Sequence, residues 1–180
     1  MCSSDLVQGV ADGPAMEAQF SFLHGLALDR DGNLLIADLG ANKVRMLSPA
    51  AIVSTLAGST EGFADGTGSR AQLAEPRAVA PAREGGVFVA DTRNNRIRHV
   101  DPSGTVKTLA GDGTSGYDDG VGTIARFFDP HGLAADEKGN LFITGATARV
   151  RILMSDGVVR TLTGGVGAES GYRDGPGEQA

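Results

Sequence analysis

The stretch GFADGTGSRAQL at residues 62–73 decides how the rest of this sequence is interpreted, because close copies of it recur along the chain. The copies are GVADGPAMEAQF at 9–20, GYDDGVGTIARF at 116–127 and the shorter GYRDGPGEQA at 171–180. Their Asp-Gly pairs lie 53, 54 and 55 residues apart. A fixed period of this length is typical of an array of structural repeats. We therefore expect repeats over 9–61, 62–115 and 116–170, and the start of a fourth over 171–180.

Each repeat contains four short apolar segments separated by turn residues. In the second repeat they are RAVAPA at 77–82, VFVAD at 87–91, RIRHVD at 96–101 and TVKTLAG at 105–111. Short segments bounded by Gly, Asp and Asn are typical of antiparallel strands joined by tight turns. Four such strands, repeated about every 50 residues, form one blade of a β-propeller. The sequence therefore predicts an all-β chain of three four-stranded blades, about half of a six-bladed ring. We expect the blades near 23–58, 77–111 and 131–164.

The distribution of side-chain sizes also indicates a propeller. The first segment of each repeat carries small residues, as an innermost strand must where blades converge: Gly25, Ala27, Ala78, Ala80, Gly132 and Ala134. Larger side chains from the second and third segments are expected to pack between blades: Leu35, Ile36, Phe88, Val89, Phe142, Ile143, Val44, Ile97 and Val150. Terminal blades then expose an apolar face, unless further blades from a longer chain or a second copy cover it.

Composition excludes several functional classes. The 180 residues carry 16 basic and 22 acidic side chains, a net charge of -6, so nucleic acid is not an expected partner. No apolar run approaches the roughly 18 residues that a membrane span requires. The single cysteine, Cys2, excludes an internal disulfide and a thiolate metal cluster. The cellular compartment stays open, and an extracellular or periplasmic location is compatible with the sequence.

The first residues differ in character from the repeats. The segment CSSDL at 2–6 matches what a common sequencing-library adapter would encode if it were read in frame. We therefore expect residues 1–8 to be a non-native or disordered segment, and residues 9–180 to be the repeat region.

Three segments resemble the NHL-repeat family of β-propellers: PHGLAADEKGNLFIT at 130–144, VADTRNNRIRHVDPSGTVKTLAG at 89–111 and DGTGSRAQL at 65–73. The resemblance implies a non-catalytic module of a six-bladed propeller that binds a protein or a polar or anionic ligand. Similar propellers, such as gluconolactonases, hold a metal in the central channel. The resemblance therefore leaves an alternative, part of a metal-dependent lactonase-like hydrolase. The third repeat departs from the pattern at Gly145 and Ala148, so we expect its second hairpin to be remodelled.

The recurring acids are interpreted as structural. Asp12, Asp65, Asp119 and Asp174 precede Gly in loops, where Asp usually accepts hydrogen bonds from backbone N–H groups of its own turn. Asp38 and Asp91 lie four residues before Asn42 and Asn95 and seven before Arg45 and Arg98. We expect these sets to brace the second hairpin of each blade by hydrogen bonds or ion pairs.

The candidate ligand-binding residues are His24, Arg77 and His131, which share one position of the repeat directly before the expected innermost strand. In a propeller this position lies at one mouth of the central channel. Imidazole and guanidinium groups can bind an anionic ligand or an acidic protein loop there, and Arg77 disfavours a metal cation. The structural alternative is that the three side chains cap strand ends and face water. No nucleophile motif or phosphate-binding loop occurs, so we expect no catalytic residue, metal ligand or cofactor.

Overall fold

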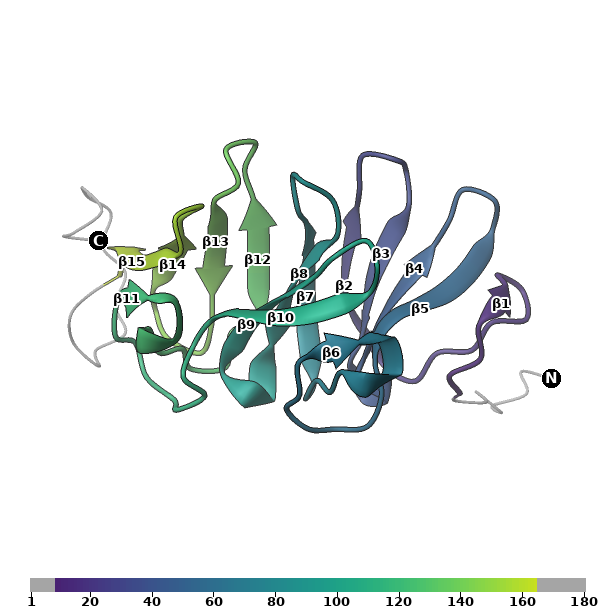
Figure 1. Ribbon diagram of the computed structural model, residues 1–180, viewed down its shortest axis with the longest axis horizontal. Coiled ribbons are helices and arrows are strands. Elements are labelled where there is room, and N and C mark those ends of the chain that lie inside the picture. The colour runs from purple at the N-terminus through teal and green to yellow at the C-terminus, as the bar shows by residue number, and fades with distance from the viewer. Residues whose placement is uncertain (1–8, 165–180) are drawn as a thin grey trace.

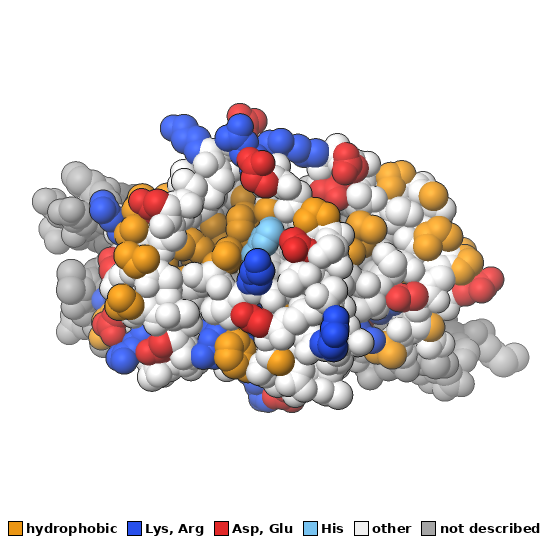
Figure 2. All heavy atoms as spheres, in the orientation of Figure 1, with side chains coloured by type: hydrophobic (Ala, Val, Ile, Leu, Met, Phe, Trp, Pro, Cys, Tyr) orange, Lys and Arg blue, Asp and Glu red, His pale blue; other side chains and the backbone are white. Residues whose placement is uncertain are grey.

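The computed structural model describes residues 9–164, which form three antiparallel sheets lying side by side (Figure 1). The same view in space-filling form shows hydrophobic side chains between scattered charged groups (Figure 2). Each sheet has five strands, and their orders are β1-β5-β4-β3-β2, β6-β10-β9-β8-β7 and β11-β15-β14-β13-β12. The four long strands of each sheet follow one another as a meander, so the prediction of three propeller blades is confirmed.

The long strands agree with the predicted blades to within one residue at either end of each blade. The first sheet contains β2 (Leu23–Leu28), β3 (Leu34–Asp38), β4 (Lys43–Leu47) and β5 (Ile52–Gly58). The second contains β7 (Pro76–Pro81), β8 (Val87–Asp91), β9 (Arg96–Val100) and β10 (Thr105–Ala110). The third contains β12 (Gly132–Ala135), β13 (Leu141–Thr144), β14 (Val150–Leu153) and β15 (Val158–Thr163).

A fifth, two-residue strand completes each sheet at its outer edge. These strands are β1 (Gly13–Pro14), β6 (Gly66–Thr67) and β11 (Gly120–Val121), and each pairs antiparallel with the last long strand of its own blade. The prediction of four strands per blade was therefore incomplete, because two residues are too few to show the alternation by which strands are recognised. The recurring Asp-Gly motif leads directly into this edge strand.

Four short 3₁₀ turns complete the described part of the chain: η1 (Leu39–Ala41), η2 (Gly68–Arg70), η3 (Thr92–Asn94) and η4 (Gly122–Ile124). None of these turns has the length or apolar character of a helix that crosses a membrane. In the first and second sheets, η1 and η3 join the second and third long strands. The third blade has no such turn between residues 144 and 150, which agrees with the expected remodelling of this hairpin. A Cβ on Gly145 would lie 2.6 Å from the Phe128 carbonyl oxygen, so glycine permits this close backbone approach.

The innermost strands approach one another closely enough to explain their small side chains. Strand β7 neighbours both β2 and β12. A Cβ added to Gly25 of β2 would lie 2.5 Å from the carbonyl oxygen of Arg77 and 2.8 Å from the Cα of Ala78. Because both atoms belong to the backbone of β7, a larger residue at position 25 cannot be accommodated without moving the strands apart.

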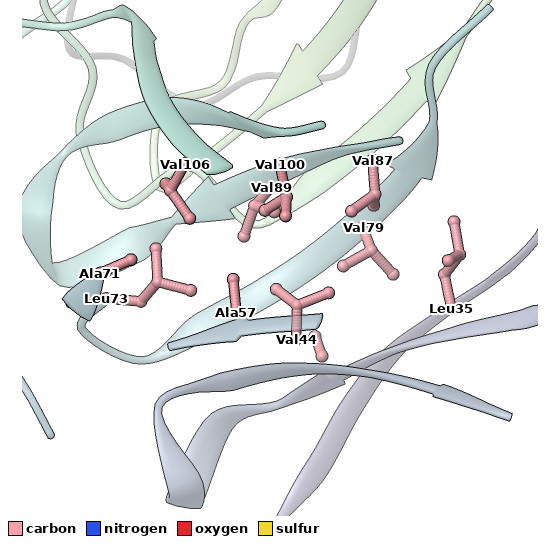
Figure 3. Packing of buried hydrophobic residues seen from close by; sticks show 11 residues of the cluster. Leu35, Val44, Ala57, Ala71, Leu73, Val79, Val87, Val89, Val100 and Val106 are labelled. Carbon is pink, nitrogen blue, oxygen red and sulfur yellow. The ribbon is translucent and has the colours of Figure 1, made fainter. Parts of the chain in front are cut away.

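The core consists of two apolar layers, each between two neighbouring sheets. Leu35, Val44 and Ala57 of the first sheet pack against Val79, Val87, Val89, Val100 and Val106 of the second (Figure 3). The second layer joins Ala80, Ile97 and Ala110 to Leu141, Ile143, Leu153 and Val159 of the third sheet. Of the predicted packing residues, Leu35, Ile36, Val44, Val89, Ile97 and Ile143 are buried, and Phe88, Phe142 and Val150 are half-buried.

The outer face of the first sheet is apolar and has no neighbouring sheet among residues 9–164. Leu26 and Leu28 are 58% and 66% exposed, whereas Ala27 between them packs against the first core layer. Alternate residues of a strand face opposite sides of its sheet, so the two leucines lie on the side away from the second sheet.

We expect this face to drive self-association of the purified chain, and the double substitution Leu26→Gln and Leu28→Gln to reduce it. Static light scattering after size-exclusion chromatography gives the mass of each species. A wild-type chain that stays monomeric at high concentration would contradict the expectation.

Candidate functional site

The three predicted ligand-binding residues lie at the same end of neighbouring inner strands. His24 and Arg77 are the second residues of β2 and β7, and His131 directly precedes β12. The prediction that all three precede the strand is therefore correct for His131 and wrong by two positions for the other two. Strands β2 and β12 both neighbour β7, so the three backbone positions follow one another across the inner edges of the blades.

Hydrogen bonds orient both imidazole rings. Nδ1 of His24 lies 2.9 Å from the carbonyl oxygen of Arg77, and Nδ1 of His131 lies 2.9 Å from that of Asp129. A carbonyl oxygen can only accept, so Nδ1 of each ring must donate. This arrangement leaves Nε2 of each imidazole for other contacts. The His24 side chain is exposed and that of His131 is half-buried.

An acidic residue lies beside Arg77, which the sequence analysis did not anticipate. Arg77 Nη2 is 3.3 Å from Glu75 Oε2, and the other carboxylate oxygen of Glu75 is 3.0 Å from Nε of Arg93. Arg93 Nη1 in turn lies 3.2 Å from Glu61. The expected positive charge of this mouth is thus partly balanced, and a ligand carboxylate would compete with Glu75 for the guanidinium.

A second set of charged residues lies on the outer half of each blade, where one arginine joins two acids in the first and second blades and one acid in the third. Arg98 is fully buried, and its Nη1 and Nη2 lie 2.6 Å from Asp91 Oδ2 and 2.6 Å from Asp65 Oδ1. Arg45 makes the corresponding ion pairs with Asp38, at 3.2 Å, and Asp12, at 2.6 Å. We call these sets, with Arg151 and Asp119 of the third blade, the arginine network.

The partners of the Asp-Gly acids differ from the prediction. Asp12 accepts hydrogen bonds from the backbone N–H and the hydroxyl of Thr55, 43 positions away. It also accepts one from Arg45, 33 positions away. Asp65 and Asp119 repeat this arrangement with Thr108 and Thr161. These carboxylates therefore join the edge-strand loop to the third and fourth long strands rather than closing their own turns. Asp174 lies outside the described residues.

Burial and hydrogen bonding act in opposite directions on these carboxyl groups. Desolvation raises the pKa of Asp12, but the Thr55 N–H and the Arg45 guanidinium lower it more, so the pKa lies below its ordinary value. Desolvation likewise raises the pKa of Asp119, but Thr161 and Arg151 together lower it more, so this pKa also lies below its ordinary value. For the more deeply buried Asp91, desolvation outweighs the donors and raises the pKa.

The asparagines connect one blade to the next. Asn42 and Asn95 follow η1 and η3 in the left-handed region, with φ of 55° and 49°, which Asn tolerates better than most residues. Their Oδ1 atoms accept the backbone N–H of Glu75 at 2.9 Å and of Asp129 at 3.0 Å, both just before the next inner strand. The bracing predicted within the hairpin thus extends across the blade interface for these two residues.

The third blade keeps part of the arginine network. Arg151 is 4% exposed, and its Nη2 lies 2.7 Å from Asp119. Gly145 stands at the repeat position that Asp38 and Asp91 hold in the other blades. The main chain there is held instead by the Ala146 N–H, which donates to the Phe128 carbonyl oxygen at 3.0 Å.

Aromatic rings cover the buried guanidinium groups, a contact that the sequence analysis missed. Phe20 lies 5.0 Å from the Arg45 guanidinium, Phe63 4.9 Å from that of Arg98, and Phe127 5.0 Å from that of Arg151. In the sequence, an aromatic residue near each Asp-Gly pair could have indicated these ring contacts. The pattern is hard to recognise because Phe63 precedes its Asp-Gly pair, whereas Phe20 and Phe127 follow theirs. The recurring Thr of the fourth segment could likewise have indicated the hydrogen bonds to the Asp of that pair.

Comparisons with known proteins agree with this architecture. No family model matches the chain. It is 30% identical over 162 residues to NHL repeat-containing protein 2 from Bos taurus, covering 82% of this chain and 22% of that protein. It is 39% identical over 80 residues to SUPPRESSOR OF QUENCHING 1, chloroplastic, from Arabidopsis thaliana, covering 44% of this chain and 8% of that protein. The chain thus spans less than a quarter of the length of either relative.

Solved structures show the same fold. An auxiliary nutrient binding protein from Bacteroides ovatus superposes with a TM-score of 0.68 at 17% identity, over 90% of this chain and 41% of that chain. A protein of the same description from Bacteroides thetaiotaomicron gives a TM-score of 0.62 at 25% identity, over 70% of this chain and 35% of that chain. A gluconolactonase from Xanthomonas campestris gives 0.60 at 16% identity, over 81% and 48%. With its repeated Asp-Gly motif, its three blades and these relatives, the chain belongs to the NHL-repeat family of β-propellers.

Proposed function

We propose that this chain is part of a non-catalytic propeller module, which binds a protein segment or a small polar ligand through an anionic group. The binding surface is formed by His24, Arg77 and His131. The observation that carries the proposal is their shared repeat position on neighbouring inner strands, with both Nδ1 atoms engaged by carbonyl oxygens. The Arg77 guanidinium can donate hydrogen bonds to a carboxylate at this mouth, and each imidazole can donate one from Nε2 when the ring is protonated, because its Nδ1–H is already used.

The pairing of Arg77 leaves its guanidinium able to take a carboxylate ligand in place of Glu75. Its side chain is 35% exposed, and its ion pair with Glu75 is a weak one of 3.3 Å between partly exposed groups. Such pairs contribute roughly 0–1 kcal/mol, so an entering carboxylate can replace Glu75 at little cost. The completed ring would add further blades, from a longer chain or from a second copy, and these would supply the rest of the mouth.

The hydrolase alternative has less support. Within residues 9–164, no group of three or more His, Cys, Asp or Glu side chains is placed to hold a metal ion. The likeness to the gluconolactonase, at 16% identity, concerns the fold alone. We therefore make no proposal of catalysis.

We expect the peptide acetyl-Glu-Glu-Glu-Glu-amide to bind this chain and its Gln counterpart not to bind. Arg77→Ala should weaken the binding about tenfold or more, because one hydrogen bond to a charged group is worth roughly 1.5–3 kcal/mol. Glu75→Gln should strengthen it, because it removes the competing carboxylate. Isothermal titration calorimetry at about 0.05 M and 0.5 M salt also tests whether binding weakens with screening. Equal affinities of the wild type and both variants would refute the recognition role.

A further inference from the structure

A cleft between the second and third sheets has a chemistry that the proposed function does not use. It has a volume of about 360 Å³ and lies beyond the end of β7, so the length of that strand separates it from Arg77. In Figure 2 a hollow with hydrophobic side chains and a histidine is visible on this face. We call this cleft the lateral cleft, formed mainly by Phe88, His99, Leu109, Leu141, Leu153 and Lys138.

The walls of the lateral cleft are apolar on both sides. Phe88 and Leu109 of the second sheet are half-buried although they pack against the second core layer. Leu141 and Leu153 of the third sheet face them and are 1% and 5% exposed. The volume falls within the range of pockets for small ligands, roughly 300–1000 Å³. The two sheets thus leave an apolar cleft whose volume suits a small ligand, with the half-buried Phe88 and Leu109 as its accessible wall and the nearly covered Leu141 and Leu153 beneath.

Basic groups stand at the rim of this slot. Lys138 and Arg83 come from the turns between the first two long strands of their blades, and both side chains are exposed. His99 lies against Phe88, with ring centroids 5.5 Å apart, and its Nε2 is 3.3 Å from the Gly85 carbonyl oxygen. Glu84 is the acidic residue among those lining the lateral cleft, and it lies 3.8 Å from Arg83.

The corresponding space between the first and second sheets is lined by more acidic than basic side chains. Met46 pairs with Leu35 as His99 pairs with Phe88, so Met46 holds the position of His99 in the first blade. Glu84 precedes Gly85 in its turn as Lys138 precedes Gly139, so Glu84 holds the repeat position of Lys138 in the second blade. That space opens into a hollow of about 680 Å³, which the turn after β12 of the third blade also lines. Its charged lining residues are the acids Asp29, Asp31, Glu84, Asp101, Asp136 and Glu137 and the bases Arg30 and Arg83. The repeat itself therefore does not impose an apolar slot with basic groups at its rim.

We propose that the lateral cleft binds a small amphipathic carboxylate, such as a medium-chain fatty acid. The aliphatic part lies along Phe88 and Leu109, above the nearly covered side chains of Leu141 and Leu153. The carboxylate lies at the rim, where the Lys138 ammonium donates to it. His99 adds a polar edge beside the apolar slot. The site is independent of the mouth formed by His24, Arg77 and His131.

The probe for the test is octanoate, with octanamide as its uncharged counterpart. Titration of the isotope-labelled chain, followed by ¹H–¹⁵N NMR, is expected to shift resonances around the lateral cleft. Octanamide should bind more weakly, by about fivefold or more, because it lacks the charge that pairs with Lys138.

Two variants replace residues of the lateral cleft by those at the same repeat positions between the first and second sheets, which are Glu84 for Lys138 and Met46 for His99. Lys138→Glu and His99→Met should each weaken octanoate binding, the first by about tenfold or more since it reverses a rim charge. Leu28→Gln, on the exposed outer face of the first sheet, should leave it unchanged, and far-ultraviolet circular dichroism checks that each variant is folded. Three outcomes would overturn the proposal: shifts centred on β2, equal binding of octanoate and octanamide, or unchanged affinity in Lys138→Glu.

Discussion

Replacing Arg98 with Met is expected to lower the free energy of unfolding by about 3–5 kcal/mol, because it leaves a buried carboxylate without its cation. Arg98 and Asp91 are both fully buried and lie 2.6 Å apart. Asp91 keeps the Ala74 N–H at 2.7 Å and the Asn94 amide at 2.9 Å, which compensate part of its charge. Met keeps an unbranched side chain at this position but removes the guanidinium, which lies 4.9 Å from the Phe63 ring. Equilibrium urea unfolding, followed by circular dichroism, measures the loss.

A second substitution separates the charge effect from packing. In the double variant Arg98→Met and Asp91→Asn no buried charge remains, and the Asn oxygen still accepts the Ala74 N–H. We expect this double variant to be more stable than Arg98→Met alone. The control is Arg160→Met on β15, where the side chain is exposed and the change should stay within about 0.5 kcal/mol. Equal losses for Arg98→Met and Arg160→Met would contradict a stabilising role of the arginine network.

Gly25→Ala is expected to cost about 1–3 kcal/mol, the usual effect of overpacking a closely packed site. The added methyl group would lie 2.5 Å from the Arg77 carbonyl oxygen and 2.8 Å from the Ala78 Cα. Backbone atoms of β7 cannot rotate away, so the first and second blades must separate. The same urea unfolding experiment applies, and Gly25→Val should cost more than Gly25→Ala.

The matched control for Gly25 is Gly132, which holds the same position in the third repeat. There the new methyl group would meet the hydroxyl of Thr144, an exposed side chain that can change rotamer. Gly132→Ala should therefore cost less than about 1 kcal/mol. If both substitutions destabilise the protein equally, a close backbone approach of the inner strands is not what requires glycine at position 25.

Much of the fold was predictable because its information is local. The period of the Asp-Gly motif indicated the repeats, and the alternation of apolar residues located the four long strands of each blade. The small residues of the first segment followed from the geometry of converging blades, and Gly25 against β7 shows this crowding directly. The two-residue strands β1, β6 and β11 were missed because their pairing partners lie about 40 residues ahead in the chain.

The candidate site was predictable in position but not in its contacts. A shared repeat position was sufficient to group His24, Arg77 and His131. The neighbouring Glu75 was not recognised, because it faces Arg77 only once residue 75 adopts its left-handed backbone, with φ of 48°. The lateral cleft had no signature in the sequence, since Phe88 and Leu141 lie in different repeats and each resembles an ordinary core residue.

By itself, the sequence determined the class of fold, the repeat period, the strands and the residues that share each repeat position, because hydrophobic alternation and turn chemistry act over a few residues. The tertiary structure decided which distant groups meet. Asp12 reaches Arg45 and Thr55 only because the edge strand folds back onto β5. The two blade interfaces acquired different chemistry in the same way, since stacking the sheets brings Lys138 and His99 to one cleft and Asp29 and Asp101 to the other. Contacts of this kind depend on how far apart sheets come to lie in space, which no local pattern of residues encodes.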